Sequence, residues 1–300
     1  MPTDLDSTEI ASASGAEIQA PAAGGRVNRY ALFVLPALTL MAGIYVYPLW
    51  IVVEQSVHDD KGVLTIEGYR ELLTGPLFFR VLWTSLEIDV MATAIALVAA
   101  YPIAYHLSRQ TSRRRMVLSG LVLLPLWTSV LVKSLAFIVV FGDSGIVAAG
   151  LRWLGLEPPQ MMFNRTGVLI GLVHYFIPFM AFPILSSLLQ RDPSLEKAAR
   201  IMGAGRLRIF WRIIVPLSMP GVLAGCLLSF ILCLGFFVTP ALLGSRKDVM
   251  LANLIDFYLR QTFDWTIAAA ASVLLLMLSA VFIVLLARVP GGRKLVVEGV

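Results

Sequence analysis

The sequence has little charge and few side chains that carry chemistry. Only 14% of its 300 residues are Asp, Glu, Lys or Arg, and it holds three histidines and two cysteines. The histidines, His58, His106 and His174, stand far from one another. No G-x-x-x-x-G-K-[ST] phosphate loop, G-x-S-x-G nucleophile elbow or H-E-x-x-H metal pair occurs. These absences argue against an enzyme, a nucleotide-binding subunit or a metal centre.

The two cysteines give no indication of a disulfide or a redox site. Cys226 and Cys233 are seven residues apart within one apolar run. A helix would separate their Cα atoms by about 10 Å, which is too far for a disulfide bond. We expect both to act as small apolar packing residues.

Long apolar runs are what the sequence has in abundance. Hydrophobic residues make up 58% of the chain and the mean hydropathy is +0.82, which is typical of a chain built for the bilayer. A helix needs about 20 apolar residues to cross the hydrocarbon core. Six windows meet this requirement: 30–53, 81–107, 117–141, 168–189, 211–238 and 266–286. The sequence therefore predicts an all-α integral membrane protein with six transmembrane helices.

The distribution of cations predicts the orientation of these spans. Lys and Arg are retained on the cytoplasmic side, and here they cluster before the first span, after the second, between the fourth and fifth, and after the sixth. Both termini should then be cytoplasmic, and the net charge of +5 needs no nucleic acid to explain it. We predict a disordered cytoplasmic tail over 1–28, a transmembrane domain over 29–290 and a cytoplasmic tail over 291–300.

The loop between the fourth and fifth spans carries its own folding signals. Asp192 and Ser194 are candidate helix caps, and Glu196 falls in the first turn, where the helix dipole favours negative charge. Apolar residues recur at helical spacing on both sides of a Gly-Ala-Gly break. In the first segment they are Leu195, Ala198, Ala199 and Met202, and in the second Leu207, Phe210, Trp211 and Ile214. The pattern predicts a helix, a bend and a second helix lying along the membrane surface.

This loop resembles the EAA loop of permease subunits from bacterial binding-protein-dependent ABC importers. Ala198, Ala199, Gly203 and Pro216 fall at the expected positions, whereas Lys197 replaces the motif's glutamate. The resemblance implies the type I importer permease (MetI-like) fold and a coupling role for 192–216. The implied ATPase-coupling residues are Glu196, Lys197, Ala198, Ala199, Gly203, Ala204 and Pro216.

Other segments resemble the spermidine and putrescine permeases of the same family. They include the L-P-L-W-T-S run at 124–129, I-P-F-M at 177–180 and P-L-S-M-P-G at 216–221. The resemblance implies import of a polyamine. Related branches carry ferric iron, phosphonates or amino-acid-like compounds, and these remain alternative cargoes.

Three charged residues fall inside predicted spans, where ionisable groups usually face a cavity or a partner. Glu87, Asp89 and Lys133 lie at similar predicted depths. They can form an internal ion pair, or an acid can line the path of a cationic solute with an aromatic ring nearby. The candidate residues of the substrate path are Glu87, Asp89, Trp127, Thr128 and Lys133.

The resemblance also implies partners and a mechanism. A periplasmic binding protein delivers the solute, and a dimer of separate ABC subunits binds ATP and Mg, so this chain needs no cofactor. A second, non-identical permease completes the path in the inner membrane of a bacterium. A secondary transporter that needs no ATPase and a membrane scaffold that binds a soluble partner remain as rival functions.

Overall fold

The computed structural model describes residues 29–59 and 62–287, and in these ranges the chain is helical apart from turns and one isolated bridge between His58 and Leu64. The α-helices, in chain order, are α1 (Arg29–Ser56), α2 (Glu67–Thr74), α3 (Pro76–Ser108), α4 (Ser112–Trp127), α5 (Val130–Phe141), α6 (Ile146–Trp153), α7 (Arg165–Gln190), α8 (Ser194–Ile201), α9 (Arg206–Ile209), α10 (Val215–Leu234), α11 (Val238–Leu243), α12 (Leu251–Phe257) and α13 (Trp265–Ala287). Two π-helical turns, Phe210–Ile214 and Tyr258–Thr262, continue α9 and α12.

The chain divides into two units, and each is described by itself. Within the described residues, the first unit holds α1 up to Leu49. Pro36 and Pro48 lie inside this helix. The second unit begins at Trp50 and contains α2 to α13. All contacts discussed below lie in this second unit.

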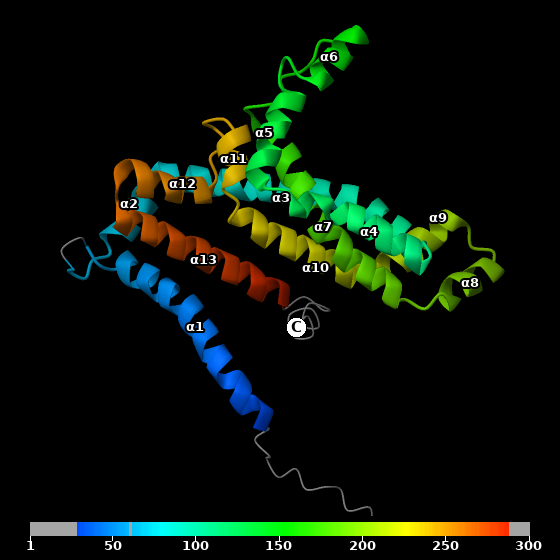
Figure 1. The fold of residues 1–300 in the computed structure, drawn as a ribbon, viewed down its shortest axis with the longest axis horizontal. Coiled ribbons are helices and arrows are strands. Elements are labelled where there is room, and N and C mark those ends of the chain that lie inside the picture. Colours follow the sequence, from blue (N-terminus) through cyan, green and yellow to red (C-terminus); the bar gives the residue numbers. More distant parts are fainter. Residues whose placement is uncertain (1–28, 60–61, 288–300) are drawn as a thin grey trace, which may run out of the picture. The chain divides into compact units, whose positions relative to one another are not determined.

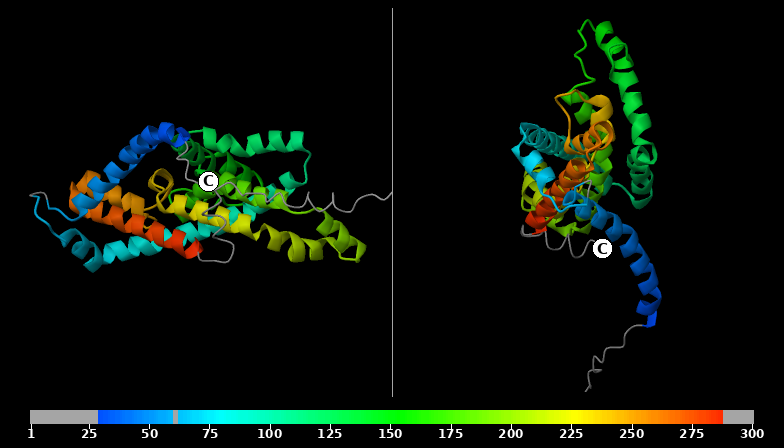
Figure 2. Two further views of the ribbon diagram at one scale, coloured as in Figure 1. Left: turned by 90° about the horizontal axis from the view of Figure 1, so that it is seen from below. Right: turned by 90° about the vertical axis from the view of Figure 1, so that its left-hand side faces the viewer.

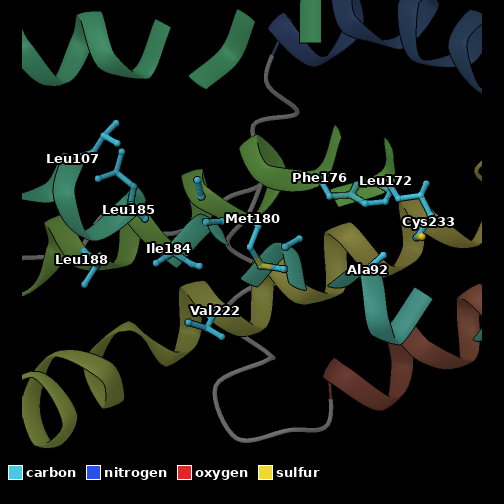
Figure 3. Packing of buried hydrophobic residues seen from close by; sticks show 14 of the residues in the cluster. Ala92, Leu107, Leu172, Phe176, Met180, Ile184, Leu185, Leu188, Val222 and Cys233 are labelled. Atoms are coloured by element: carbon cyan, nitrogen blue, oxygen red, sulfur yellow. The ribbon is translucent and has the colours of Figure 1, made fainter. Parts of the chain in front are cut away.

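Three long helices, α3, α7 and α10, form the centre of the second unit (Figures 1 and 2). They pack closely because α3 carries buried alanines at every fourth position, at 92, 96, 100 and 104. On α10, a Cβ at Gly221 would overlap the backbone carbonyl oxygen of Pro183 in α7, so only glycine allows this approach. Small interfacial residues are the usual basis of helix packing in membranes. Larger side chains of α7, including Leu172, Phe176 and Ile184, fill the space between the helices (Figure 3).

The two ends of this bundle differ. At one end, α2 and α12 pack near the start of α3 and, with α13, form a second apolar cluster around Leu72, Leu251 and Ala270. At the other end lie α8 and α9, which belong to the loop between α7 and α10 (Figure 1).

The prediction of six apolar spans is confirmed, with one correction. Among the described residues, six segments are long and apolar enough to cross a membrane: Leu35–Ser56, Pro76–Ser108, Val130–Trp153, Arg165–Gln190, Arg206–Leu234 and Trp265–Val284. The third was predicted as one helix over 117–141, and this is wrong. The backbone is extended at Thr128 and Ser129, three residues after Pro125, so the segment is divided between α4 and α5. The predicted tails 1–28 and 291–300 lie outside the described residues.

Candidate functional site

The loop between α7 and α10 folds as its sequence predicts. The Asp192 carboxylate accepts hydrogen bonds from the Ser194 amide (2.8 Å) and hydroxyl (2.6 Å), and α8 begins there. These bonds hold the pKa of Asp192 below its ordinary value. Gly203, with φ at +81°, ends α8, while its amide bonds to the Arg200 carbonyl and the Ala204 amide bonds to the Ala199 carbonyl. This pair of bonds is a Schellman motif, which requires the left-handed conformation that glycine adopts freely.

Glu196 joins this loop to the bundle. Its side chain is only 10% exposed, and its Oε1 atom pairs with Arg191 at the end of α7 and, at 2.9 Å, with Arg109 just after α3. Arg200, one turn further along α8, lies 3.8 Å from Oε2. Arg109 also donates to the Tyr105 hydroxyl at 2.7 Å. A single carboxylate therefore connects α8 to the ends of both α3 and α7.

The second half of the loop is held by aromatic rings. Phe210 makes edge-to-face contacts with Tyr101 and Tyr105 of α3, at centroid distances of 5.8 and 5.5 Å. The Tyr101 hydroxyl lies 2.9 Å from the Ser218 hydroxyl of α10. These contacts bind α3 to the turn between α9 and α10.

The opposite face of the loop is exposed. Lys197 and Ala198 point outward from α8, whereas Ala199 is buried. The apolar residues predicted at helical spacing are also divided between the two faces of the loop. Met202 and Trp211 are exposed, whereas Ile214 is buried. Ala204 is partly buried at the bend, and Pro216 is the second residue of α10, which directly follows the π-helical turn Phe210–Ile214.

Glu87 of α3 pairs with a residue that the sequence did not single out. The Arg165 side chain, at the first residue of α7, donates to Glu87 at 2.6 Å and lies 3.4 Å from the Asp248 carboxylate. Asp248 in turn accepts from the Ser245 hydroxyl at 2.5 Å. Arg165 stood outside the predicted fourth span, 168–189, so its pairing with an acid in α3 depended on the tertiary fold.

Asp89 is fully buried between helices and has no ion-pair partner among the described residues. The Cys233 thiol of α10 is the polar group beside it. Thr93 and Ser229 follow one helical turn away on α3 and α10, and their hydroxyls also lack partners in the described part of the chain. Since α3 and α10 are antiparallel, these four residues form one buried polar seam. Asp89 is therefore not on a surface in this structure.

Lys133 stabilises the break between α4 and α5 and does not pair with either acid. Its Nζ atom donates to the Pro125 carbonyl at 2.5 Å and lies 4.9 Å from the centroid of the Tyr175 ring. A cation near the last carbonyls of a helix is stabilising. The possible internal ion pair between Lys133 and Glu87 or Asp89 is thus absent. Trp127 and Thr128, which flank the break, are exposed, Trp127 by 83%.

Comparison with known proteins decides the family. Residues 79–290 match the family described as "Binding-protein-dependent transport system inner membrane component". The chain belongs to this family. It is therefore a multi-pass inner-membrane permease, and the resemblance based on the EAA-like loop is confirmed.

Individual relatives agree with this assignment. The chain is 38% identical over 217 residues to the spermidine/putrescine transport system permease protein PotB of Escherichia coli (strain K12), covering 72% of this chain and 78% of that protein. The PotB protein of Haemophilus influenzae is 36% identical over 222 residues, covering 73% and 77%. A crystal structure of a bacterial ABC transporter involved in the import of the acidic polysaccharide alginate matches with a TM-score of 0.68 at 17% identity, over 85% of this chain and 93% of that chain. This likeness confirms the predicted permease fold.

Proposed function

We propose that this permease forms the membrane path of a polyamine importer, with spermidine and putrescine as cargo. The observation that carries the proposal is the 38% identity with the PotB permease over 78% of that protein's length. The exposed Trp127 ring also suits a cationic cargo. The test below distinguishes polyamines from the alternative cargoes, which are amino-acid-like solutes, phosphonates and ferric iron.

The proposed partners follow from the family. The 192–216 loop faces the cytoplasm and docks on a dimer of ATPase subunits, which bind ATP and Mg and perform the hydrolysis. A second, non-identical permease completes the path, and a periplasmic binding protein delivers the cargo to the opposite face. The exposed Ile146 and Trp153 side chains of α6 offer that protein an apolar contact. Both termini of this chain then lie in the cytoplasm.

Of the residues predicted to line the cargo path, we expect the exposed ones to contact the cargo in the conformation described here. The exposed Trp127 ring can offer its face to an ammonium group, next to the Thr128 hydroxyl. Glu87 is 40% exposed, but Arg165 balances its charge. Asp89 can meet the cargo only in a state in which α3 and α10 separate. Lys133 supports the α4–α5 break, next to Trp127 and Thr128.

The proposed mechanism is alternating access driven by the ATPase. A partner shifts a conformational equilibrium only when it binds one state more tightly than the other. The loop meets this requirement if its position relative to α3 and α7 differs between the two states. Glu196 and Phe210 are the contacts through which such a difference reaches the helices.

The test is uptake of labelled spermidine and putrescine by proteoliposomes that contain this chain, the second permease and the ATPase, with ATP inside and the binding protein outside. We expect uptake that stops when any one component is omitted. Stimulation of ATP hydrolysis by a loaded binding protein without polyamine uptake would keep the importer and reject the cargo. Uptake without an ATPase would support a secondary transporter and contradict the mechanism.

A further inference from the structure

The coupling loop exposes an excess of positive charge. The coupling loop, 192–216, contains two acids, Asp192 and Glu196, and five cations, Lys197, Arg200, Arg206, Arg208 and Arg212. Glu196 is turned inward, to Arg109 and Arg191, whereas Asp192 is exposed at the start of α8 and accepts its hydrogen bonds from Ser194. All five cations are exposed. The exposed charges of the loop are therefore five cations and one acid, Asp192, so its outward face carries an excess of positive charge.

Four of the cations have no ion-pair partner among the described residues, the exception being Arg200, which reaches Glu196. Three of the four, Arg206, Arg208 and Arg212, surround a shallow hollow of about 590 Å³ beside the bend at Gly203. Leu207 and Trp211, 72% and 61% exposed, supply its apolar part. Unpaired arginines beside an exposed aromatic ring are a composition typical of an interface.

Lys197 extends this face along α8, one residue after the inward-turned Glu196. It occupies the position at which the EAA pattern has glutamate. The substitution therefore reverses the charge at one point of the proposed docking surface. A partner suited to glutamate at this point would repel lysine, because like charges placed together across an interface are costly.

We propose that the 194–214 segment docks into an acid-lined, apolar-floored groove of the ATPase, with Lys197 facing a carboxylate and an acidic projection entering the hollow between Arg206, Arg208 and Arg212. This inference rests on the proposed function and adds the chemistry of the partner's surface. Glu196 does not contact the ATPase. It is a positioning residue that holds the loop against α3 and α7.

The experiment measures binding of the purified ATPase to the permease pair in nanodiscs of neutral lipid, over a range of salt concentrations, together with uptake by the complete transporter. Lys197→Glu should weaken ATPase binding by about tenfold and flatten its salt dependence, because an attractive contact becomes repulsive. Arg208→Glu should act in the same direction. Unchanged or tighter binding by Lys197→Glu, which restores the glutamate of the EAA pattern, would overturn the proposal.

Arg113→Glu is the matched control, since Arg113 is an exposed cation at the start of α4, outside the loop. It should leave ATPase binding unchanged. Equal losses for Arg113→Glu and Lys197→Glu would assign the effect to general electrostatics and contradict a specific groove. An effect of Lys197→Glu that appears only in anionic lipid would assign the cations to lipid headgroups and also overturn the proposal.

Glu196→Gln separates positioning from docking. If Glu196 only holds the loop, this variant keeps the salt dependence of ATPase binding but loses cargo uptake relative to ATP hydrolysis. A changed salt dependence would place Glu196 in the interface and contradict the assignment. A wild-type complex without ATPase binding or ATP-dependent uptake would instead refute the proposed function, so the two failures are distinguishable.

Discussion

Two buried carboxylates in this permease have opposite surroundings. Glu196, at the loop end of the bundle, is 10% exposed and pairs with three arginines. Asp89, inside the bundle, is fully buried, has no ion-pair partner among the described residues and has only the weakly donating Cys233 thiol beside it. Burial of a charge is costly unless the charge is paired. Glu196 is therefore suited to hold elements together. Asp89 lacks a charged partner in this conformation, and a different conformation or a ligand can provide one.

Removal of the Glu196 carboxylate should have the largest effect. Glu196→Ala leaves Arg191, 12% exposed, and Arg109 without their counter-charge, and loss of one partner in such a site costs about 3 kcal/mol. We expect a clear fall in the melting temperature of the purified permease. The control is Glu67→Ala, because its partner Arg70 is 4.0 Å away and both side chains are over 70% exposed. That variant should lose no more than about 0.5 kcal/mol, and equal losses would contradict the distinction between the two pairs.

The corresponding change at Asp89 should have the opposite sign. Asp89→Leu replaces a buried, unpaired carboxyl with an apolar group, which should raise stability by about 1 kcal/mol. Uptake of polyamine should nevertheless fall, since leucine cannot offer the cargo a carboxylate when α3 and α10 separate. Thr93→Val is the matched control, as it removes a second unpartnered group of the seam without removing a charge. Destabilisation by Asp89→Leu would show that the carboxyl is satisfied in the native protein and would remove the contrast with Glu196.

Substitutions at Gly203 show whether transport depends more on the charge of the outward face or on the backbone conformation of the bend. A Cβ at this position meets open space, but its φ of +81° is unfavourable for most side chains. Gly203→Asp adds an acid to a cationic face and should abolish uptake while the protein remains in the membrane. Gly203→Asn has the same shape, tolerates this conformation and should retain a measurable part of the uptake. Normal uptake by Gly203→Asp would refute the coupling role of the loop.

The cap at Asp192 should give the smallest effect. The bonds from Ser194 lower the pKa of Asp192 below its ordinary 3.8, so the cap is complete above that value and is lost as the pH falls through the lowered pKa. Because Asp192 stays ionised between about pH 5 and 8, its titration should cause no change of uptake with pH in that range. Asp192→Ala should accelerate hydrogen exchange at the Ser194 amide. Unchanged exchange would mean that the cap does not form in solution.

The features that the sequence predicted well are those set by local patterns. Hydropathy located the spans, and Gly203 together with the spacing of apolar residues located the bend, because both signals act within one helix length. The break after Trp127 was missed because the run 117–141 is apolar enough overall to be taken as one span, despite its polar residues Thr128, Ser129 and Lys133. Pro125 was the local signal for that break, and Lys133 eight residues later supplies the cap.

The pairing of charges could not be predicted in the same way. Arg109 and Arg191 belong to the cation clusters that served only to predict the orientation of the spans, yet both meet Glu196. Which side of α8 faces the bundle depends on how α3 and α7 end, so Glu196 and Lys197, adjacent in sequence, could not be assigned to inward and outward faces. Arg165 is a similar case, since its partner Glu87 is 78 residues away.

The most direct test of the account is photo-crosslinking in the assembled transporter, with a benzoylphenylalanine residue placed at Met202 or at Trp153. Both side chains are over 80% exposed, Met202 in the coupling loop and Trp153 on α6. We predict that the probe at position 202 links to the ATPase and that the probe at position 153 links only to the binding protein. Absence of an ATPase adduct at position 202 in every nucleotide state would contradict the claim that this loop couples ATP hydrolysis to transport.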